Sequence, residues 1–174
     1  IARDSILVVR DEAGVINGYR NACLHRGRQL KSGCGNSREL KCPFHGFTWT
    51  LNGQFSSAPC EWDFPHIDKQ HFNLPAVKVE TWGGWVFINM DRNAKPLHEY
   101  LGILPEHFER WKPENAYKMI HVEKVIPCNW KVGWEAFIES YHAIATHPQI
   151  LPYTDDADSQ YDVWEPHISR TITA

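Results

Sequence analysis

The chain has 174 residues, of which 43% are apolar and 22% charged, a composition typical of a globular protein with one domain or two small ones. The formal net charge is −3 and the 18 basic residues are dispersed, which excludes the basic face expected of a nucleic-acid-binding protein. No apolar run reaches the roughly 20 residues of a membrane span, and the first residues do not resemble a signal peptide. We therefore expect a soluble, cytoplasmic protein with no nucleic-acid or membrane partner.

The first ninety residues read as short β-strands separated by turns. Strand-forming runs rich in β-branched and aromatic residues occur at 5–10, 15–19, 47–50, 77–80 and 85–89, with a turn at 51–54. This pattern predicts an antiparallel β domain. Because the chain opens on Ile1 and a strand follows at once, we expect the native N-terminus to lie further upstream.

The pattern changes after Asp91. Two short helices are predicted at 97–104 and 106–111, then a strand at 117–126, a longer helix from Asn129 and a final strand beginning at 168. These features predict an α+β protein with one domain at 1–95 and the first part of a second domain at 96–174. No stop signal follows the final strand, so we expect the second domain to be truncated.

Two cysteine–histidine pairs form the strongest motif of the chain. Cys23-Leu24-His25 and Cys42-Pro43-Phe44-His45 are separated by sixteen residues, and a glycine lies just beyond each pair. In a [2Fe–2S] cluster with mixed ligands, one iron takes two thiolates and the other takes two imidazoles, so each of two loops can supply one of each. We predict that Cys23, His25, Cys42 and His45 bind such a cluster.

The main alternative is a structural zinc site. The other is that the two cysteine–histidine pairs are unrelated and have this spacing by chance. Zinc sites usually pair cysteine with cysteine and histidine with histidine, whereas each loop here mixes the two. The mixed spacing therefore favours the iron–sulfur interpretation. Three further cysteines, Cys34, Cys60 and Cys128, belong to no motif, and we expect them to be small buried apolar residues.

These two motifs resemble the Rieske domain of the Rieske non-haem iron oxygenases, over most of residues 5–91. The Rieske proteins of respiratory and photosynthetic cytochrome complexes carry an additional disulfide cysteine in each loop, at positions occupied here by Arg28 and Phe44. The resemblance therefore implies the soluble oxygenase type. It also implies a Rieske domain at 1–95, followed at 96–174 by the start of an α+β catalytic domain of the helix-grip type.

The stretch that begins at Asn129 combines an apolar row with a polar row. The apolar residues recur at helical spacing and predict a helix, capped by Asn129, whose apolar face packs into a core: Trp130, Trp134, Phe137, Ile138, Tyr141 and Ala145. In the polar row, Glu139 and His142 are neighbours one turn apart. Taken alone, this pair is more typical of an exposed acidic helix face.

His147 adds a second imidazole to the polar row. Five residues along a regular helix would leave His142 and His147 about 140° apart. Pro148 disfavours helical backbone at His147, so we expect the helix to unwind there and His147 to turn back toward His142. Two histidines and one carboxylate form the facial triad with which non-haem Fe(II) oxygenases bind O₂.

The same stretch resembles the iron-binding helix of the Rieske oxygenases, in which an acidic residue and two histidines follow the spacing of Glu139, His142 and His147. The resemblance implies that His142 and His147 bind a mononuclear Fe(II), and that Glu139 carries the electron path from His45 of a neighbouring subunit. It implies a head-to-tail ring, commonly a homotrimer, and a third iron ligand, a carboxylate, beyond Ala174. The acids at positions 155, 156 and 158 are more simply interpreted as a solvated turn.

The function implied by the resemblance is that of a terminal oxygenase. A ferredoxin or reductase would reduce the cluster, and the electron would reach Fe(II), where O₂ is activated to hydroxylate a small organic substrate, in the first instance an aromatic one. Ring-hydroxylating members usually have Asp where this chain has Glu139, and Glu resembles members that oxidise quaternary ammonium compounds, so a monooxygenase or demethylase is the alternative. A Rieske ferredoxin-like electron carrier is the alternative from a different class, against which the second domain argues.

The sequence leaves open which substrate is used and whether a small β subunit joins the ring. We expect the 174 residues alone to be inactive, because most of the substrate pocket would be built by residues outside them.

Overall fold

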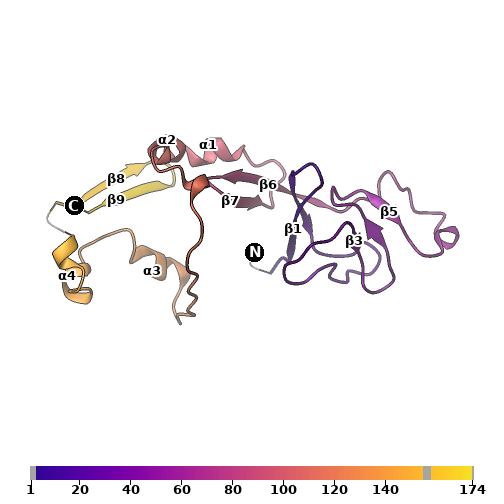
Figure 1. The fold of residues 1–174 in the computed structure, drawn as a ribbon, viewed down its shortest axis with the longest axis horizontal. Coiled ribbons are helices and arrows are strands. Elements are labelled where there is room, and N and C mark those ends of the chain that lie inside the picture. Colours follow the sequence, from indigo (N-terminus) through magenta and orange to yellow (C-terminus); the bar gives the residue numbers. More distant parts are fainter. Residues whose placement is uncertain (1–2, 155–157, 174) are drawn as a thin grey trace. The chain divides into compact units, whose positions relative to one another are not determined.

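The computed structural model describes residues 3–154 and 158–173, and it divides into two compact units, Ile1–Leu97 and His98–Ala174 (Figure 1). The first unit consists of β-strands and loops. The second contains short helices and one β-hairpin. Every strand pair formed by the described residues is antiparallel, and the α+β class predicted from the sequence is confirmed.

The first unit is built from two small sheets. The four-stranded sheet has the order β1-β2-β6-β7, and its strands are β1 (Ile6–Arg10), β2 (Ile16–Arg20), β6 (Ala76–Trp82) and β7 (Trp85–Asn89). The three-stranded sheet has the order β3-β4-β5, and its strands are β3 (Leu40–Lys41), β4 (Thr48–Trp49) and β5 (Phe55–Ser57), followed by a 3₁₀ turn η1 (Glu61–Asp63). The strands expected from the sequence are therefore present, with shifts of a few residues at their ends.

The core of the first unit lies beneath the segments that carry the cysteine–histidine pairs. Trp49 is fully buried, and its indole N–H donates a 2.9 Å hydrogen bond to the Phe72 carbonyl. The remaining buried core residues come from both sheets and from the connecting loops: Tyr19, Cys23, Leu30, Leu40, Cys42, Phe47, Phe55 and Leu74. Because two of these residues are the motif cysteines, the same packing that stabilises the unit also fixes both loops.

The predicted turn at 51–54 is confirmed, and it brings β5 back against β4. Gly53 has φ +80°, in the left-handed region that favours glycine, and its N–H donates to the Thr50 carbonyl. A Cβ at position 53 would lie 2.4 Å from the ring of Tyr19. Glycine is therefore required here both by the backbone conformation and by the close approach of Tyr19.

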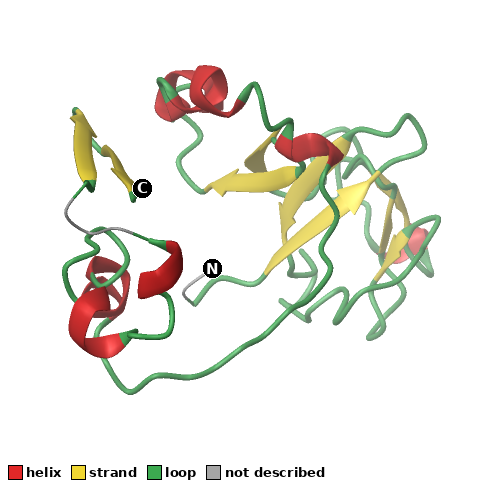
Figure 2. Cartoon of the chain, turned by 60° about the vertical axis from the view of Figure 1, so that its left-hand side comes forward, coloured by secondary structure: helices red, strands yellow, loops and turns green. Residues whose placement is uncertain are grey.

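The second unit contains short helices joined by long irregular segments (Figure 2). Its elements are α1 (Leu97–Leu101), α2 (Leu104–Phe108), η2 (Pro113–Asn115), α3 (Trp130–Glu135), α4 (Ala143–Thr146), η3 (Leu151–Tyr153), β8 (Gln160–Trp164) and β9 (Ile168–Ile172). The β8–β9 hairpin is tied to the first two helices, because Arg170 contacts His107 and the ring of His167 stacks on Tyr100 at 4.1 Å. None of the helices among the described residues has the length and hydropathy of a membrane span.

Two predictions for the second unit are wrong. Residues 117–126 form no strand, although their sequence favours one. A strand needs a neighbour to satisfy its backbone hydrogen bonds, and no segment among the described residues pairs with this one. The predicted long helix is also interrupted, because α3 ends at Glu135 and α4 begins only at Ala143.

The expected burial of the second unit's apolar residues is not observed either. Trp130 is 72% exposed and Phe137 is 84% exposed, so the apolar face of α3 and the segment that follows it are not packed into a core. The prediction that Cys34, Cys60 and Cys128 are buried is also wrong, because all three are exposed. Asp158 is exposed in a turn, as expected, while residues 155 and 156 lie outside the described residues.

Candidate metal centres

The two cysteine–histidine loops of the first unit share one backbone design. In each loop the cysteine carbonyl accepts a hydrogen bond from the glycine four residues later: Gly27 to Cys23 and Gly46 to Cys42, at 2.8 and 3.1 Å. Each cysteine N–H donates in turn to the carbonyl five residues later, at 2.8 Å. Both glycines have φ near +75°, at 72° and 75°, so each turn closes in a conformation that glycine adopts without strain.

This shared design brings the four candidate donors together. Cys23 and Cys42 are both buried, with 4% and 2% of their surface exposed. The rings of His25 and His45 lie 4.8 Å apart at 64°. Phe47 fixes His25 by stacking on it at 4.7 Å, whereas His45 is exposed and lies beside Phe44. The two imidazoles therefore lie beside each other, with His45 as the more accessible one, and both cysteines are buried.

The chemistry of the loops fits an iron–sulfur cluster. The buried Nδ1 of His25 has no hydrogen-bond partner among the described residues, and a buried nitrogen of this kind is costly unless it binds something. Burial lowers the pKa of His25, and His45 and Arg26 lower it further, which keeps the imidazole in the neutral form that coordinates metals. Burial also raises the pKa of the Cys23 thiol, which disfavours the thiolate form. A bound cation would favour the thiolate and so reverse this effect.

Asn21 supports the first loop without belonging to the motif. Its buried amide donates to the Lys31 carbonyl at 2.7 Å and accepts from the backbone N–H groups of Leu30 and Lys31 at 3.1 Å. These bonds close the base of the loop that contains Cys23 and His25. Sequence analysis missed this residue, and the only available signal was an amide side chain two positions before the cysteine.

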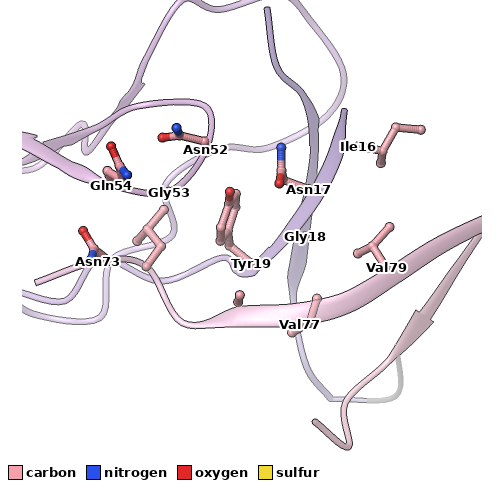
Figure 3. Close-up of a pocket in the computed structure, with 12 residues that line it drawn as sticks. Ile16, Asn17, Gly18, Tyr19, Asn52, Gly53, Gln54, Asn73, Val77 and Val79 are labelled. Atoms are coloured by element: carbon pink, nitrogen blue, oxygen red, sulfur yellow. The ribbon is translucent and has the colours of Figure 1, made fainter. Parts of the chain in front are cut away.

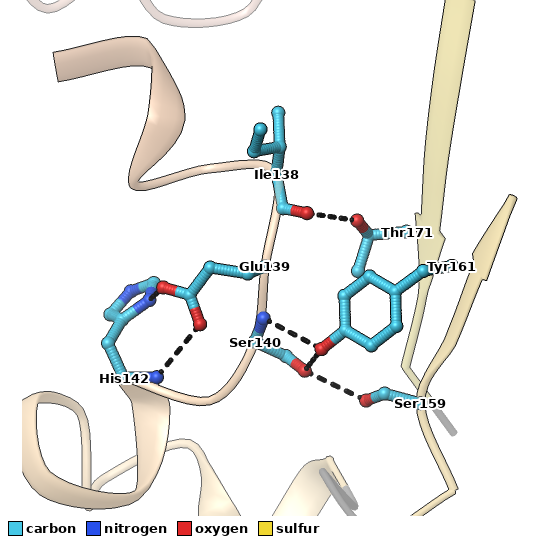
Figure 4. A network of polar contacts seen from close by, with 7 residues as sticks. All are labelled: Ile138, Glu139, Ser140, His142, Ser159, Tyr161 and Thr171. Atoms are coloured by element: carbon cyan, nitrogen blue, oxygen red, sulfur yellow. Dashed lines mark hydrogen bonds and ion pairs between the residues drawn. The ribbon is translucent and has the colours of Figure 1, made fainter. Parts of the chain in front are cut away.

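In the second unit, Glu139 and His142 are in direct contact. One carboxylate oxygen of Glu139 pairs with Nδ1 of His142, and the other accepts from the backbone N–H of His142 at 3.1 Å (Figure 4). The hydrogen bond with His142 holds the pKa of Glu139 below its usual range, so the carboxylate is ionised at neutral pH. Because Nδ1 of His142 is engaged, Nε2 is the nitrogen left to bind a metal.

His147 lies close to His142. The two rings are 5.4 Å apart at 75°, and His147 ends α4 with non-helical backbone, φ −126° and ψ 55°. The expected unwinding before Pro148 is therefore observed. A second break, at residues 136–142, was not expected from the sequence, and it places Glu139 outside any helix.

Among the described residues, no three or more His, Cys, Asp or Glu side chains converge on a point where one metal ion would bind. A binuclear cluster needs only two protein donors for each iron. The second unit brings two imidazoles together, but Glu139 is turned toward His142 rather than toward a point shared with His147. This placement suits Glu139 as a partner of a ligand rather than as a ligand.

The first unit also contains hollows. One, of about 470 Å³, is bordered by His25 and by aromatic residues, and so adjoins the cluster loops. A second, of about 370 Å³, lies between β2, β6 and the turn at 51–54, and it is lined by amides and small apolar residues (Figure 3). Its one titratable side chain is Tyr19, whose pKa is raised to about 12 by burial and by the Asp11 charge. A tyrosine with this pKa stays protonated, so the second hollow offers no acid–base chemistry at neutral pH.

Comparison with known proteins finds a different family model in each unit. Residues 1–74 match the model of the Rieske [2Fe-2S] domain, and residues 106–173 match that of the ring hydroxylating alpha subunit (catalytic domain). The two matches lie in different units.

Relatives of both catalytic types are similar to the chain. It is 31% identical over 173 residues to the glycine betaine monooxygenase oxygenase subunit of Pseudomonas aeruginosa, a match that covers 99% of this chain and 39% of that protein. It is 34% identical over 153 residues to the chlorobenzene dioxygenase subunit alpha of a Cupriavidus species, covering 84% of this chain and 34% of that protein.

Solved structures give the same result. A crystal structure of a quaternary ammonium Rieske monooxygenase superposes with a TM-score of 0.86 at 27% identity, covering 93% of this chain and 46% of that one. The chain thus spans less than half the length of the relatives it matches. Both family models and the relatives that match across both units agree, and the chain belongs to the Rieske non-haem iron oxygenases.

Proposed function

We propose that the protein is the terminal oxygenase component of a Rieske system, which passes electrons from a [2Fe–2S] cluster to a mononuclear Fe(II) site and so activates O₂ to hydroxylate an organic substrate. The observation that carries this proposal is the presence of two separate donor sets in one chain. A four-donor set of cysteines and histidines lies in the first unit, and a Glu-His-His set lies in the second. A pure electron carrier has no use for the second set.

In this proposal Cys23 and Cys42 hold one iron of the cluster, and His25 and His45 hold the other. When bound, the cluster supplies a one-electron relay. The chain's contribution is to bury both thiols, to keep the imidazole of His25 neutral and to leave His45 at the surface. An exposed imidazole ligand is where an electron can leave the domain, and an external ferredoxin or reductase would supply that electron.

In this proposal His142 and His147 hold the mononuclear iron, together with a carboxylate that the described residues do not supply. Bound Fe(II) supplies the redox chemistry of O₂ activation. Glu139 orients His142 through Nδ1 and so directs Nε2 toward the metal. An ionised carboxylate has about four acceptor sites, and the side chain of Glu139 is 40% exposed, so it can also accept a bond from His45 of a neighbouring subunit. That contact requires a head-to-tail ring, which we propose to be a homotrimer, either alone or with a β subunit.

Two substrate classes are candidates. Hydroxylation of a small, aromatic molecule is the first candidate, because an aromatic dioxygenase subunit is among the relatives. A second candidate, oxidation of a quaternary ammonium compound, is favoured by Glu139 in place of the usual aspartate and by the similarity to two quaternary ammonium monooxygenases.

Replacement of His142 by alanine tests the iron site. In the holoprotein, His142→Ala should lose the mononuclear iron and substrate-dependent O₂ consumption while the visible absorption of the cluster persists, because the cluster ligands lie in the other unit. His121→Ala, which removes an exposed histidine of the same unit, is the matched control and should retain both centres. Unchanged iron content in His142→Ala would contradict the oxygenase proposal.

The bridging role of Glu139 has a separate test. Glu139→Gln keeps the size of the side chain and removes its charge, so both metal centres should remain while the transfer of electrons between them slows by about 10–100-fold, the usual effect of a lost partner to a metal ligand. The measurement is the rate of cluster re-oxidation in a single turnover. Wild-type kinetics in this variant would rule out the bridge.

A further inference from the structure

The segment that carries Glu139 has no helical support of its own. Residues 136–142 lie between α3 and α4 and form neither helix nor strand. The carbonyl of Ile138 and the N–H of Ser140, on either side of Glu139, are therefore not bonded within a helix. Something else must hold the backbone at the point where electrons are proposed to cross.

The β8–β9 hairpin supplies the missing partners through side-chain hydroxyls. Thr171 donates a 2.7 Å hydrogen bond to the Ile138 carbonyl, and Tyr161 Oη accepts from the Ser140 N–H at 3.2 Å (Figure 4). The hydroxyls of Tyr161 and Ser140 are also 2.7 Å apart. The Ser140 hydroxyl donates to that of Ser159 at 2.9 Å, and the Tyr161 phenol contacts both the N–H and the hydroxyl of Ser140.

The register of the hairpin places these two hydroxyls side by side. Tyr161 and Thr171 are directly opposite each other in the antiparallel pair, so their side chains leave the same face of the hairpin. They bind residues 138 and 140, the two neighbours of Glu139. Figure 4 shows the side chain of Glu139 directed away from the hairpin toward His142.

Ser140, which the hairpin binds, is more buried than the Glu139 and His142 side chains next to it. Ser140 is only 8% exposed, whereas the side chains of Glu139 and His142 are 40% and 34% exposed. A buried N–H that loses its partner costs free energy, so the bond from the Ser140 N–H to Tyr161 should be maintained. The Glu139 carboxylate and the His142 imidazole remain accessible to solvent.

We propose that Tyr161 and Thr171 form a hydroxyl clamp that positions the Glu139 carboxylate for electron transfer to the iron site. The proposal rests on the proposed function of Glu139 and His142, and it assigns Tyr161 as a positioning residue rather than a ligand. The clamp holds the backbone on both sides of Glu139, at the Ile138 carbonyl and the Ser140 N–H, and it also contacts the Ser140 hydroxyl.

The test compares four substitutions in the holoprotein. Tyr161→Phe removes only the phenol hydroxyl, and Tyr153→Phe removes one from an exposed tyrosine of the same unit as the matched control. Thr171→Val removes the second hydroxyl of the clamp without changing the size of the side chain, and Thr171→Ser retains it. The readouts are backbone hydrogen exchange over residues 136–142, the single-turnover rate of cluster re-oxidation, and iron content.

The expected result is that Tyr161→Phe raises hydrogen exchange in this segment about tenfold, the effect of losing a net hydrogen bond or two. Iron content should persist while electron transfer slows by a similar factor. Thr171→Val should give a smaller change of the same kind, and Thr171→Ser should restore wild-type behaviour.

Two results would overturn the proposal. One is hydrogen exchange in Tyr161→Phe equal to that in Tyr153→Phe. The other is faster exchange with an unchanged electron-transfer rate, because the hydroxyls would then be merely structural. Failure of the proposed function would appear elsewhere, as unchanged iron content in His142→Ala, and hydrogen exchange would still decide whether the hydroxyls hold the segment.

Discussion

Asn21 illustrates how far a metal site depends on a residue that binds no metal. Its amide is 8% exposed and closes the base of the first cluster loop by bonding to the backbone at both Leu30 and Lys31. An amide is suited to this position because it is both a donor and an acceptor. The bonded groups are backbone groups, so the role of Asn21 does not depend on which residues occupy positions 30 and 31.

Asn21→Ala should therefore lower the free energy of unfolding of the cluster domain by about 1–3 kcal/mol, because it leaves buried N–H groups without an acceptor. The denaturant midpoint for loss of the cluster's visible absorption measures this change. Asn36→Ala, an exposed asparagine of the neighbouring loop region, is the control and should leave the midpoint unchanged. Equal midpoints for the two variants would show that Asn21 does not support the loop.

The β8–β9 hairpin combines several roles in one short element. Asp162 and Arg170 are directly opposite in its register and form an ion pair, and the Arg170 guanidinium also lies 5.1 Å from the centre of the Trp164 ring. Arg170 further contacts His107 of α2. The pair therefore stabilises the hairpin and also joins it to a helix.

This ion pair predicts an acid dependence of stability. Hydrogen bonds from Gln160 and then Arg170 hold the pKa of Asp162 below its ordinary value of 3.8. A carboxyl with a lowered folded pKa contributes stability that is fully present above the unfolded value, and that contribution is lost as the pH falls through the folded value. Between neutral pH and about pH 4, Asp162→Asn should therefore be less stable than wild type, and below the folded pKa the difference should shrink. Thermal unfolding of both proteins across this range is the measurement, and a constant difference would contradict it.

At the scale of the elements, the first unit could be predicted well and the second less well. Strands at 5–10 and 85–89 carry their own signal, because they are short runs of β-branched and other large apolar residues and their partners lie in the same unit. Residues 117–126 carry a similar signal but form no strand, because pairing is a property of two segments and sequence patterns report only one. The break at 136–142 has no glycine or proline to announce it, and the hydroxyls that hold it come from residues far along the chain.

The candidate donors could be named from the sequence, but their surroundings could not. Spacing identifies Cys23, His25, Cys42 and His45 because metal chemistry restricts which residues can appear. It says nothing of the buried His25 Nδ1 or of the stacking of Phe47, both of which follow from packing. Tyr161 was out of reach for the same reason, because its role depends on strand register rather than on a motif.

At the scale of the whole molecule, the buried core of the first unit is self-contained. All of its members lie between Tyr19 and Leu74, and they include both motif cysteines. Because the core and the cluster loops belong to the same unit, neither depends on residues after 97. The second unit, by contrast, leaves many large apolar residues exposed.

Residues 1–97 expressed alone should therefore fold and incorporate the cluster. The expected readout is visible absorption together with iron and acid-labile sulfide in equal amounts, which also separates the cluster from a zinc site. Cys42→Ser in the same fragment serves as the control and should abolish both signals. A colourless or unfolded fragment of wild-type sequence would show that the first unit requires the second.

The pairing of Tyr161 with Thr171 also limits where this chain tolerates insertions and deletions. Successive side chains of a strand point to opposite faces, so a change of one residue in the length of the 165–167 connection would shift the pairing and turn one of the two hydroxyls away from residues 136–142. Substitutions in that connection do not change its length, so we expect them to leave the register unchanged. In laboratory evolution of this protein, insertions and deletions should therefore be far less tolerated at 165–167 than at an exposed loop such as 32–38. Both segments lie on the surface, and neither contains a proposed metal ligand.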